Sequence, residues 1–225
     1  MALGLALSPL ARWREVQSTE LAWLNAGERK RLAGFTSSAR RQQFVAGRWL
    51  MRELLAQVHG GEPTEQVVDL HDAARSCLPR GHANLSHSGD WLVVVQADLP
   101  VGVDLERLRP RRDLLGLARM VHSPAQCEAL AALDGEARLH QFYRWWTLKE
   151  AWLKARGQGL DMARMRGLDF TQGTAEHSDT CSTLLPRAGL ALSICCDEID
   201  AARLPVTLAD EPLVWQFYQS TPKSK

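Results

Sequence analysis

The chain has 225 residues, of which 45% are hydrophobic and 24% are charged, and its formal net charge at pH 7 is +1. These values are typical of an ordinary soluble globular protein and exclude a largely disordered chain. No apolar run approaches the ~20 residues that a membrane-spanning helix needs. The near-neutral charge also argues mildly against a protein that binds nucleic acid through a basic groove.

Local charge and cysteine content add two expectations. Basic clusters lie at residues 29–31, 40–41 and 107–112; such clusters are most often solvated faces, but each could also meet an anionic ligand. The five cysteines are an odd number and show neither a CxxC pair nor a metal-binding His/Cys spacing. A reduced, cytoplasmic protein is therefore expected.

The chain begins with a predicted strand and a long helical segment. Residues 1–10, MALGLALSPL, lack a basic start before their apolar run, so they indicate a first strand rather than a signal peptide. Apolar residues then recur at helical spacing through residues 28–59. Gly60 and Gly61 follow directly and predict the end of this helical segment.

The next segment predicts a loop and two strands. Residues 77–90 are rich in turn residues and are expected to form a loop. The runs at residues 91–98 and 101–108 have strand character and are separated by Pro100, so they predict a hairpin.

The second half predicts helices followed by strands. Ser123 and Pro124 are typical of a helix start, and a longer helix is expected over residues 136–156, ended by Gly157. Strand candidates follow at residues 167–172, 190–196, 204–210 and 212–219. The order of helix then strands occurs twice, which predicts an α+β protein with two halves of about 100 residues each.

One predicted strand places two carboxylates together. Alternation along the strand puts Gly102, Asp104 and Glu106 on the face opposite the apolar residues. The glycine is expected to leave room for a ligand beside the two carboxylates. The alternative interpretation is a half-exposed strand with a polar outer face.

The long second helix carries charge through a tryptophan-rich stretch, WWTLKEAWLKARG. Glu150 shares a stripe with aromatic and apolar residues, where a lone buried carboxylate would be costly. An i,i+4 pair with Lys154 is the simple explanation, although a surface pair of this kind contributes only about 0.3–0.5 kcal/mol. Lys149, about 100° round the helix from Glu150, is expected to face another direction.

If Glu150 converges on Asp104 and Glu106, the three carboxylates would repel one another unless a cation held them together. A site with oxygen ligands only suits Mg²⁺, which commonly completes its coordination with water and phosphate. Mg²⁺ with a nearby lysine is typical of chemistry that stabilises charge on phosphoryl groups.

Residues 84–91, NLSHSGDW, are small and polar and precede a predicted strand. Ser86 and His87 are adjacent, so they do not by themselves form a nucleophile and base, and the chain has no GxSxG elbow. A histidine with serine hydroxyls can instead donate hydrogen bonds to phosphate, although an isolated histidine in a loop is usually structural. Neither GxGxxG nor a P-loop is present.

Taken together, NLSHSGDW, VGVDLER (101–107) and WTLKEAWLK (146–154) resemble the motifs of Sfp-like 4′-phosphopantetheinyl transferases, the surfactin-synthetase-activating type. The motifs cover about residues 84–159, and the match is looser elsewhere. The resemblance implies a pseudo-dimer of two α+β halves, here residues 1–100 and 101–225, with the active site in the cleft between them. It implies transfer of phosphopantetheine from coenzyme A to a serine of an apo carrier protein, with release of adenosine 3′,5′-bisphosphate.

By the same resemblance, Asp104, Glu106 and Glu150 fall on the family's acidic ligands of Mg²⁺, and Lys154 falls on the lysine that contacts the pyrophosphate of coenzyme A. As a hypothesis, Glu150 takes the proton of the incoming serine, directly or through a water, while Lys154 and His87 neutralise charge that grows on the phosphates and on the leaving adenosine 3′,5′-bisphosphate. The nucleophile belongs to the partner, so this chain needs none of its own.

Ser86 and His87 match family positions that contact the phosphates of coenzyme A. Arg40 and Arg48 lie where the family has basic residues that bind the 3′-phosphate end. The family often has Gly-Lys-Pro before its NxSHS segment, whereas this chain has Ala-Arg-Ser there. Either Arg75 replaces the lysine, with fork rather than point geometry, or the loop differs from that of the family.

The expected partners are coenzyme A and apo acyl or peptidyl carrier proteins of fatty-acid, polyketide or nonribosomal-peptide synthesis, with no nucleic acid or membrane partner. A monomer is expected, because a pseudo-dimeric chain completes its own site. Two other readings remain open. One is a Mg²⁺-dependent nuclease or phosphohydrolase, which could also use a DxE pair and a distant glutamate. The other is a non-enzymatic module that binds carrier proteins or peptides and whose ion pairs are structural.

Overall fold

The computed structural model describes residues 3–13, 21–68, 76–77 and 81–222. Helices and antiparallel strands are mixed along the chain, which confirms the predicted α+β class. The helices are α1 (Ala26–Ala33), α2 (Ser38–His59), α3 (Leu114–Val121), α4 (Pro124–Ala131), α5 (Gly135–Ala155) and α6 (Met162–Arg166). The strands are β1 (Leu3–Pro9), β2 (Ser76–Cys77), β3 (His82–Ser88), β4 (Trp91–Ala97), β5 (Val101–Arg107), β6 (Leu168–Gly173), β7 (Thr180–Leu185), β8 (Leu190–Cys196), β9 (Thr207–Leu208), β10 (Glu211–Pro212) and β11 (Gln216–Pro222).

The first sheet has the strand order β1-β4-β3-β2 and is antiparallel throughout. Its outer face packs against α2, because Leu92 and Val94 on β4 meet Leu50, Met51 and Leu54 on the helix. This alternation along β4 leaves Val93 and Val95 on the opposite, inner face, where they join a second core cluster.

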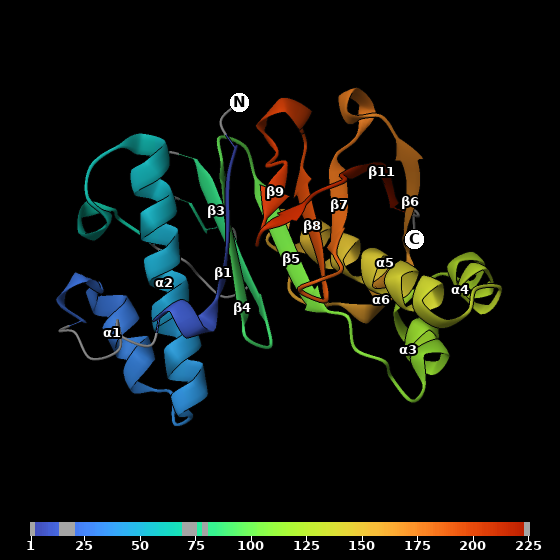
Figure 1. Cartoon of the computed structure of the whole chain (residues 1–225), viewed down its shortest axis with the longest axis horizontal. Helices are drawn as coiled ribbons and strands as arrows, with labels where there is room; N and C mark the ends of the chain where they lie inside the picture. Colours follow the sequence, from blue (N-terminus) through green and yellow to red (C-terminus); the bar gives the residue numbers. More distant parts are fainter. Residues whose placement is uncertain (1–2, 14–20, 69–75, 78–80, 223–225) are drawn as a thin grey trace.

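The second sheet has the strand order β5-β8-β7-β11-β6 and is also antiparallel. Its inner face carries Val103, Leu192 and Ile194 and packs against the inner face of the first sheet. Its outer face is covered by α5, where Ala151 and Ala155 lie against Cys195. The chain is therefore layered as helix α2, first sheet, second sheet and helix α5 (Figure 1).

The helical segment predicted over residues 28–59 consists of two helices. Gly34 caps the end of α1, and the side chain of Ser37 accepts a hydrogen bond from the backbone N–H of Arg40 and so caps the start of α2. The predicted stop is confirmed, because Gly60 follows α2 with a φ of 80°, a conformation that favours glycine. The predicted start at Ser123 is confirmed as well, with a capping box at the start of α4.

Two expectations about residues 77–108 are wrong. Within the predicted loop, residues 82–88 form strand β3 in the middle of the first sheet. The predicted hairpin of residues 91–98 and 101–108 does not form either, because β4 pairs with β1 and β3, whereas β5 pairs with β8 in the other sheet. The sequence patterns also missed α3 and β7; in β7 the polar Ser182 and Thr183 are buried, which hides the alternation that marks a strand.

Two further properties of the described residues bear on the expectations. None of their helices combines the length and apolar character needed to cross a membrane. Among the described residues, Cys127, Cys181, Cys195 and Cys196 are free thiols.

Candidate active site

The site lies where helix α5 crosses strand β5, and Gly102 allows them to approach. A Cβ atom at this position would lie 2.1 Å from the carbonyl oxygen of Ala151 and 2.4 Å from the backbone nitrogen of Ala155. The missing side chain therefore makes room for the helix backbone. The expectation that Gly102 leaves room for a ligand is wrong.

Close packing of α5 on β5 brings the three predicted carboxylates within electrostatic range. Asp104 is only 5% exposed, and Glu106 and Glu150 are half-buried. Burial and the charge of Asp104 raise the pKa of Glu106. Burial, followed by the charge of Asp104, raises the pKa of Glu150 to about 7, and Lys154 only partly offsets these effects. The arrangement is therefore electrostatically unfavourable when all three groups are ionised.

Lys154 points from α5 to the centre of this cluster. Its Nζ donates to Asp104 Oδ1 at 2.7 Å, to Ser86 Oγ at 3.1 Å and to the carbonyl oxygen of Val103 at 3.2 Å. Among the ion pairs of the described residues, the partner of Lys154 is Asp104 and not Glu150. The i,i+4 ion pair between Glu150 and Lys154, which was the simple explanation of these charges, is therefore not observed.

The carboxylates offer ligands for a divalent cation, although they are not arranged around one site. In the part of the chain that the structure describes, no three or more His, Cys, Asp or Glu side chains are gathered into a cage that could hold a metal ion as they stand. The donor set is nevertheless suited to one. Asp104 Oδ2 is buried without a hydrogen-bond partner in the described residues, and oxygen ligands of mutually repelling carboxylates suit Mg²⁺. The oxygen ligands therefore suit Mg²⁺, but the side chains of Asp104, Glu106 and Glu150 would have to shift for all three to contact one ion.

Ser86 lies in the same cluster, but its hydroxyl is already fully used. It is 6% exposed, donates to Asp104 Oδ1 at 2.9 Å, and accepts from Lys154 Nζ and from the backbone N–H of Leu105. A hydroxyl has one proton and two lone pairs, so Ser86 could contact a phosphate only if one of these hydrogen bonds were replaced. The predicted phosphate contact of Ser86 stays a prediction.

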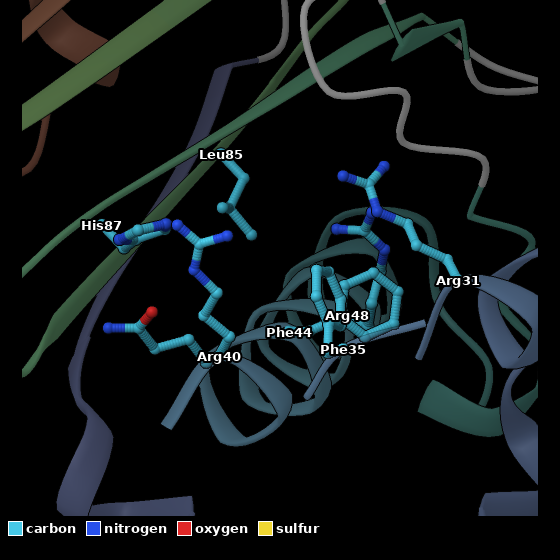
Figure 2. A pocket seen from close by; sticks show the side chains of 8 residues that line it. Arg31, Phe35, Arg40, Phe44, Arg48, Leu85 and His87 are labelled. Atoms are coloured by element: carbon cyan, nitrogen blue, oxygen red, sulfur yellow. The ribbon is translucent and has the colours of Figure 1, made fainter. Parts of the chain in front are cut away.

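His87, on the other face of β3, lines a pocket of about 280 Å³ between this strand and helices α1 and α2. The pocket is lined by Arg31, Phe35, Arg40, Gln43, Phe44, Arg48, Leu85 and His87. Figure 2 shows the guanidinium of Arg40 beside His87, while Arg31 and Arg48 lie over the phenylalanine rings on the other side. Three arginines with an aromatic floor suit a ligand that is anionic and partly apolar.

Desolvation, followed by the charge of Lys154, lowers the pKa of His87, and Arg40 adds to this effect. This shift favours the neutral imidazole, which would act on a phosphate through a ring N–H rather than through a full charge.

Arg48 is held in place by a buried ion network. Its Nε lies 3.3 Å from Glu28 Oε1, and Arg52 lies 2.7 Å from the other carboxylate oxygen of Glu28. The guanidinium of Arg48 also lies 4.5 Å from the ring of Phe44. The predicted arginines Arg40 and Arg48 thus line one pocket, whereas Arg75 lies outside the described residues.

Lys149 faces away from the carboxylates, as the helical geometry predicts. Its side chain is 0% exposed, and Nζ donates to the carbonyl oxygens of Val121 and Met165 and to Gln126 Oε1, each within 2.8 Å. Lys149 therefore ties α5 to the segments around α3, α4 and α6.

Sequence reasoning missed Arg31, Phe35 and Phe44 as pocket residues. The basic cluster at residues 29–31 was the one available signal for Arg31. The two phenylalanines fit an ordinary core pattern, and nothing in their spacing separates a pocket wall from a core.

The chain is similar in sequence to known proteins. Residues 100–208 match the family model of the 4′-phosphopantetheinyl transferase superfamily. The chain is 36% identical to 4′-phosphopantetheinyl transferase HetI of Nostoc sp. over 146 residues, which are 62% of this chain and 62% of HetI. It is 24% identical to 4′-phosphopantetheinyl transferase Sfp of Bacillus subtilis over 145 residues, which are 63% of this chain and 64% of Sfp. It is 29% identical to 4′-phosphopantetheinyl transferase AcpT of Escherichia coli over 179 residues, 78% of this chain and 83% of AcpT. The chain thus spans less than two thirds of the length of HetI and of Sfp.

Proposed function

Since the chain belongs to the 4′-phosphopantetheinyl transferase superfamily, we propose that it moves the phosphopantetheine arm of coenzyme A onto a serine of an apo carrier protein. Adenosine 3′,5′-bisphosphate is the other product. The observation that carries this proposal is the convergence of Asp104, Glu106, Glu150 and Lys154 at the α5–β5 crossing, with a three-arginine pocket nearby.

The pocket is our proposed site for the adenosine 3′-phosphate end of coenzyme A. Arg40, Arg48 and Arg31 would bind the 3′-phosphate through charge-assisted hydrogen bonds, which are stronger than neutral ones. His87 would donate a ring N–H to the same anionic end. Arg75 and Ser86 stay proposed contacts of the coenzyme A phosphates.

Asp104, Glu106 and Glu150 are the residues that would hold Mg²⁺. Asp104 Oδ2 is buried and has no hydrogen-bond partner among the described residues, and the pKa values of the two glutamates are raised; both observations support this assignment. When bound, the ion would supply positive charge to the pyrophosphate of coenzyme A.

Glu150 is the proposed general base. Without a metal ion its pKa is about 7; a bound cation would lower this value and favour the ionised carboxylate, which is the form that accepts a proton. The carrier serine Oγ, losing its proton to Glu150, would form a bond to the β-phosphorus of coenzyme A. The bond from that phosphorus to the bridging oxygen would break, and adenosine 3′,5′-bisphosphate would leave. Lys154 would neutralise charge that develops on the phosphates.

We further propose that the two sheets with their helices are the two halves of a pseudo-dimer, divided near Pro100. Strands β1 to β4 precede this residue and build the first sheet, and the strands of the second sheet all follow it. The site would then lie between the halves of one chain, so that a cytoplasmic monomer suffices.

The experiment is an assay for adenosine 3′,5′-bisphosphate with coenzyme A and Mg²⁺, with and without an apo carrier protein. Product that forms only with the carrier, and not in the Glu150→Gln variant, supports the transferase. Product that forms equally well without the carrier would indicate a phosphohydrolase, and full activity of Glu150→Gln would remove the glutamate from its proposed role.

A further inference from the structure

Three side chains of β3 contact the backbone of β5 in a regular row. Asn84 Oδ1 accepts from the N–H of Val103 at 3.2 Å, Ser86 Oγ from that of Leu105 at 3.3 Å, and Ser88 Oγ from that of Arg107 at 3.0 Å. Both strands advance by two residues at each step, so the donors and the acceptors each lie on one side of their strand. We call Asn84, Ser86 and Ser88 the polar row.

The polar row supplies hydrogen-bond acceptors to the unpaired edge of the second sheet. Strand β5 lies at the edge of the second sheet and pairs on one side only, with β8. The N–H groups on its other side would be unpaired in a largely buried strand, which costs free energy. Side-chain oxygens of β3 take the place of a neighbouring strand, and they fix the register between the two sheets.

Two members of the row do more than accept. Ser86 donates its proton to Asp104 Oδ1 at 2.9 Å, and Ser88 donates its proton to Glu106 Oε2 at 2.8 Å. Each serine therefore contacts the backbone of β5 and also one carboxylate of the candidate site. Each carboxylate belongs to the residue that precedes the serine's backbone partner on β5. For Asn84, whose backbone partner is Val103, the preceding residue is Gly102, which has no side chain to contact.

The hydrogen bond between Ser88 and Glu106 determines how the Glu106 carboxylate is oriented. Glu106 is half-buried, and Asp104 repels its charge. A glutamate side chain has several rotamers, and repulsion favours those that turn the carboxylate away from Asp104. The hydroxyl of Ser88 is anchored by the N–H of Arg107, and it holds one carboxylate oxygen of Glu106 near Asp104.

We propose that Ser88 is a positioning residue of the active site: by bridging the Arg107 N–H and the Glu106 carboxylate, it keeps Glu106 oriented toward the proposed cation site beside Asp104. This inference rests on the proposed function, in which Glu106 and Asp104 hold a divalent cation. A group that orients a ligand carboxylate typically changes metal affinity or activity by about 10- to 100-fold when it is removed.

The test compares Ser88→Ala with two matched variants. Ser88→Thr keeps the hydroxyl and adds a methyl group that a half-buried strand position tolerates. Asn84→Ala removes a polar-row bond to the backbone of β5 but no bond to a carboxylate. Binding of Mn²⁺, a spectroscopic probe for the Mg²⁺ site, is measured by electron paramagnetic resonance in the absence of substrates, and kcat and KM for coenzyme A are measured separately.

We expect Ser88→Ala to weaken Mn²⁺ binding and to lower kcat by about tenfold each, with KM for coenzyme A within about twofold of the wild type. Ser88→Thr should restore both, and Asn84→Ala should lower the unfolding midpoint while leaving Mn²⁺ binding intact. The proposal is overturned if Ser88→Ala binds Mn²⁺ as the wild type does, or if Asn84→Ala weakens Mn²⁺ binding equally. Failure of the wild type to modify any carrier would overturn the proposed function instead, and the Mn²⁺ comparison would still decide the role of Ser88.

Discussion

Replacing Glu150 with glutamine should stabilise the metal-free protein while abolishing transfer. In the folded chain the pKa of Glu150 is raised from its ordinary value of 4.5 to about 7, chiefly by burial and by the charge of Asp104. Between these two pH values the folded state keeps a proton that the unfolded state has lost. The contribution of Glu150 to the free energy of unfolding is therefore most favourable below about pH 4.5, falls as the pH rises toward 7, and stays reduced above it.

The magnitude follows from the shift. At about 1.4 kcal/mol per pKa unit, the full shift corresponds to about 3 kcal/mol above pH 7. Glu150 is half-buried, so solvent screening reduces the value, and we expect Glu150→Gln to gain about 1–2 kcal/mol at pH 8. At pH 4 the two proteins should be equally stable within about 0.5 kcal/mol, because Glu150 is then protonated in both states.

The assay is urea unfolding with a chelator present, at pH 4 and pH 8, for the wild type and Glu150→Gln. A second series at pH 8 with Mg²⁺ in place of the chelator should stabilise the wild type more than the variant, because a ligand that binds the folded state stabilises it by mass action. If Glu150→Gln were no more stable than the wild type at pH 8, the three carboxylates would not repel one another as the structure indicates.

Three other substitutions test separate parts of the structure. Lys149→Met leaves three buried acceptors without their donor and should cost about 3 kcal/mol in chemical denaturation; a cost below about 1 kcal/mol would contradict the observed contacts. Gly102→Ala would force α5 away from β5 and should lower the free energy of unfolding by about 3 kcal/mol or more. The control is Gly27→Ala, at an exposed position of α1, which should change that free energy by less than about 1 kcal/mol in the same denaturation series. Arg40→Gln should raise KM for coenzyme A by about tenfold, which corresponds to the loss of one charge-assisted hydrogen bond of about 1.5 kcal/mol, and should have little effect on KM for 3′-dephospho-coenzyme A. The control is Arg41→Gln, because Arg41 lies next to Arg40 but does not line the pocket. An equal effect of Arg40→Gln on coenzyme A and on 3′-dephospho-coenzyme A would argue against a 3′-phosphate site.

The carboxylate cluster was predictable because it depends on two simple periodicities. Alternation along β5 puts Asp104 and Glu106 on one face, and the helical period of α5 turns Glu150 toward that face and Lys149 away from it. The pairing of Lys154 with Asp104 could not be predicted from these periodicities, because it depends on how close α5 lies to β5.

The part of the site formed by β3 was misjudged for a physical reason. A strand is recognised by apolar residues that alternate with solvated polar ones. In β3 the polar residues Asn84, Ser86 and Ser88 are directed at the backbone of another strand, so the segment has the composition of a loop. The arginine pocket is formed by residues of α1, α2 and β3 that are far apart in the sequence, and no local pattern brings them together.

The most direct measurement of the central claim is mass spectrometry of a panel of apo carrier proteins after incubation with this protein, coenzyme A and Mg²⁺. The account predicts that at least one carrier gains the mass of a phosphopantetheine group on its serine, and that this gain disappears in Glu150→Gln. If coenzyme A binds to the folded protein and yet no carrier of the fatty-acid, polyketide or nonribosomal-peptide classes gains that mass, the proposed activity is contradicted.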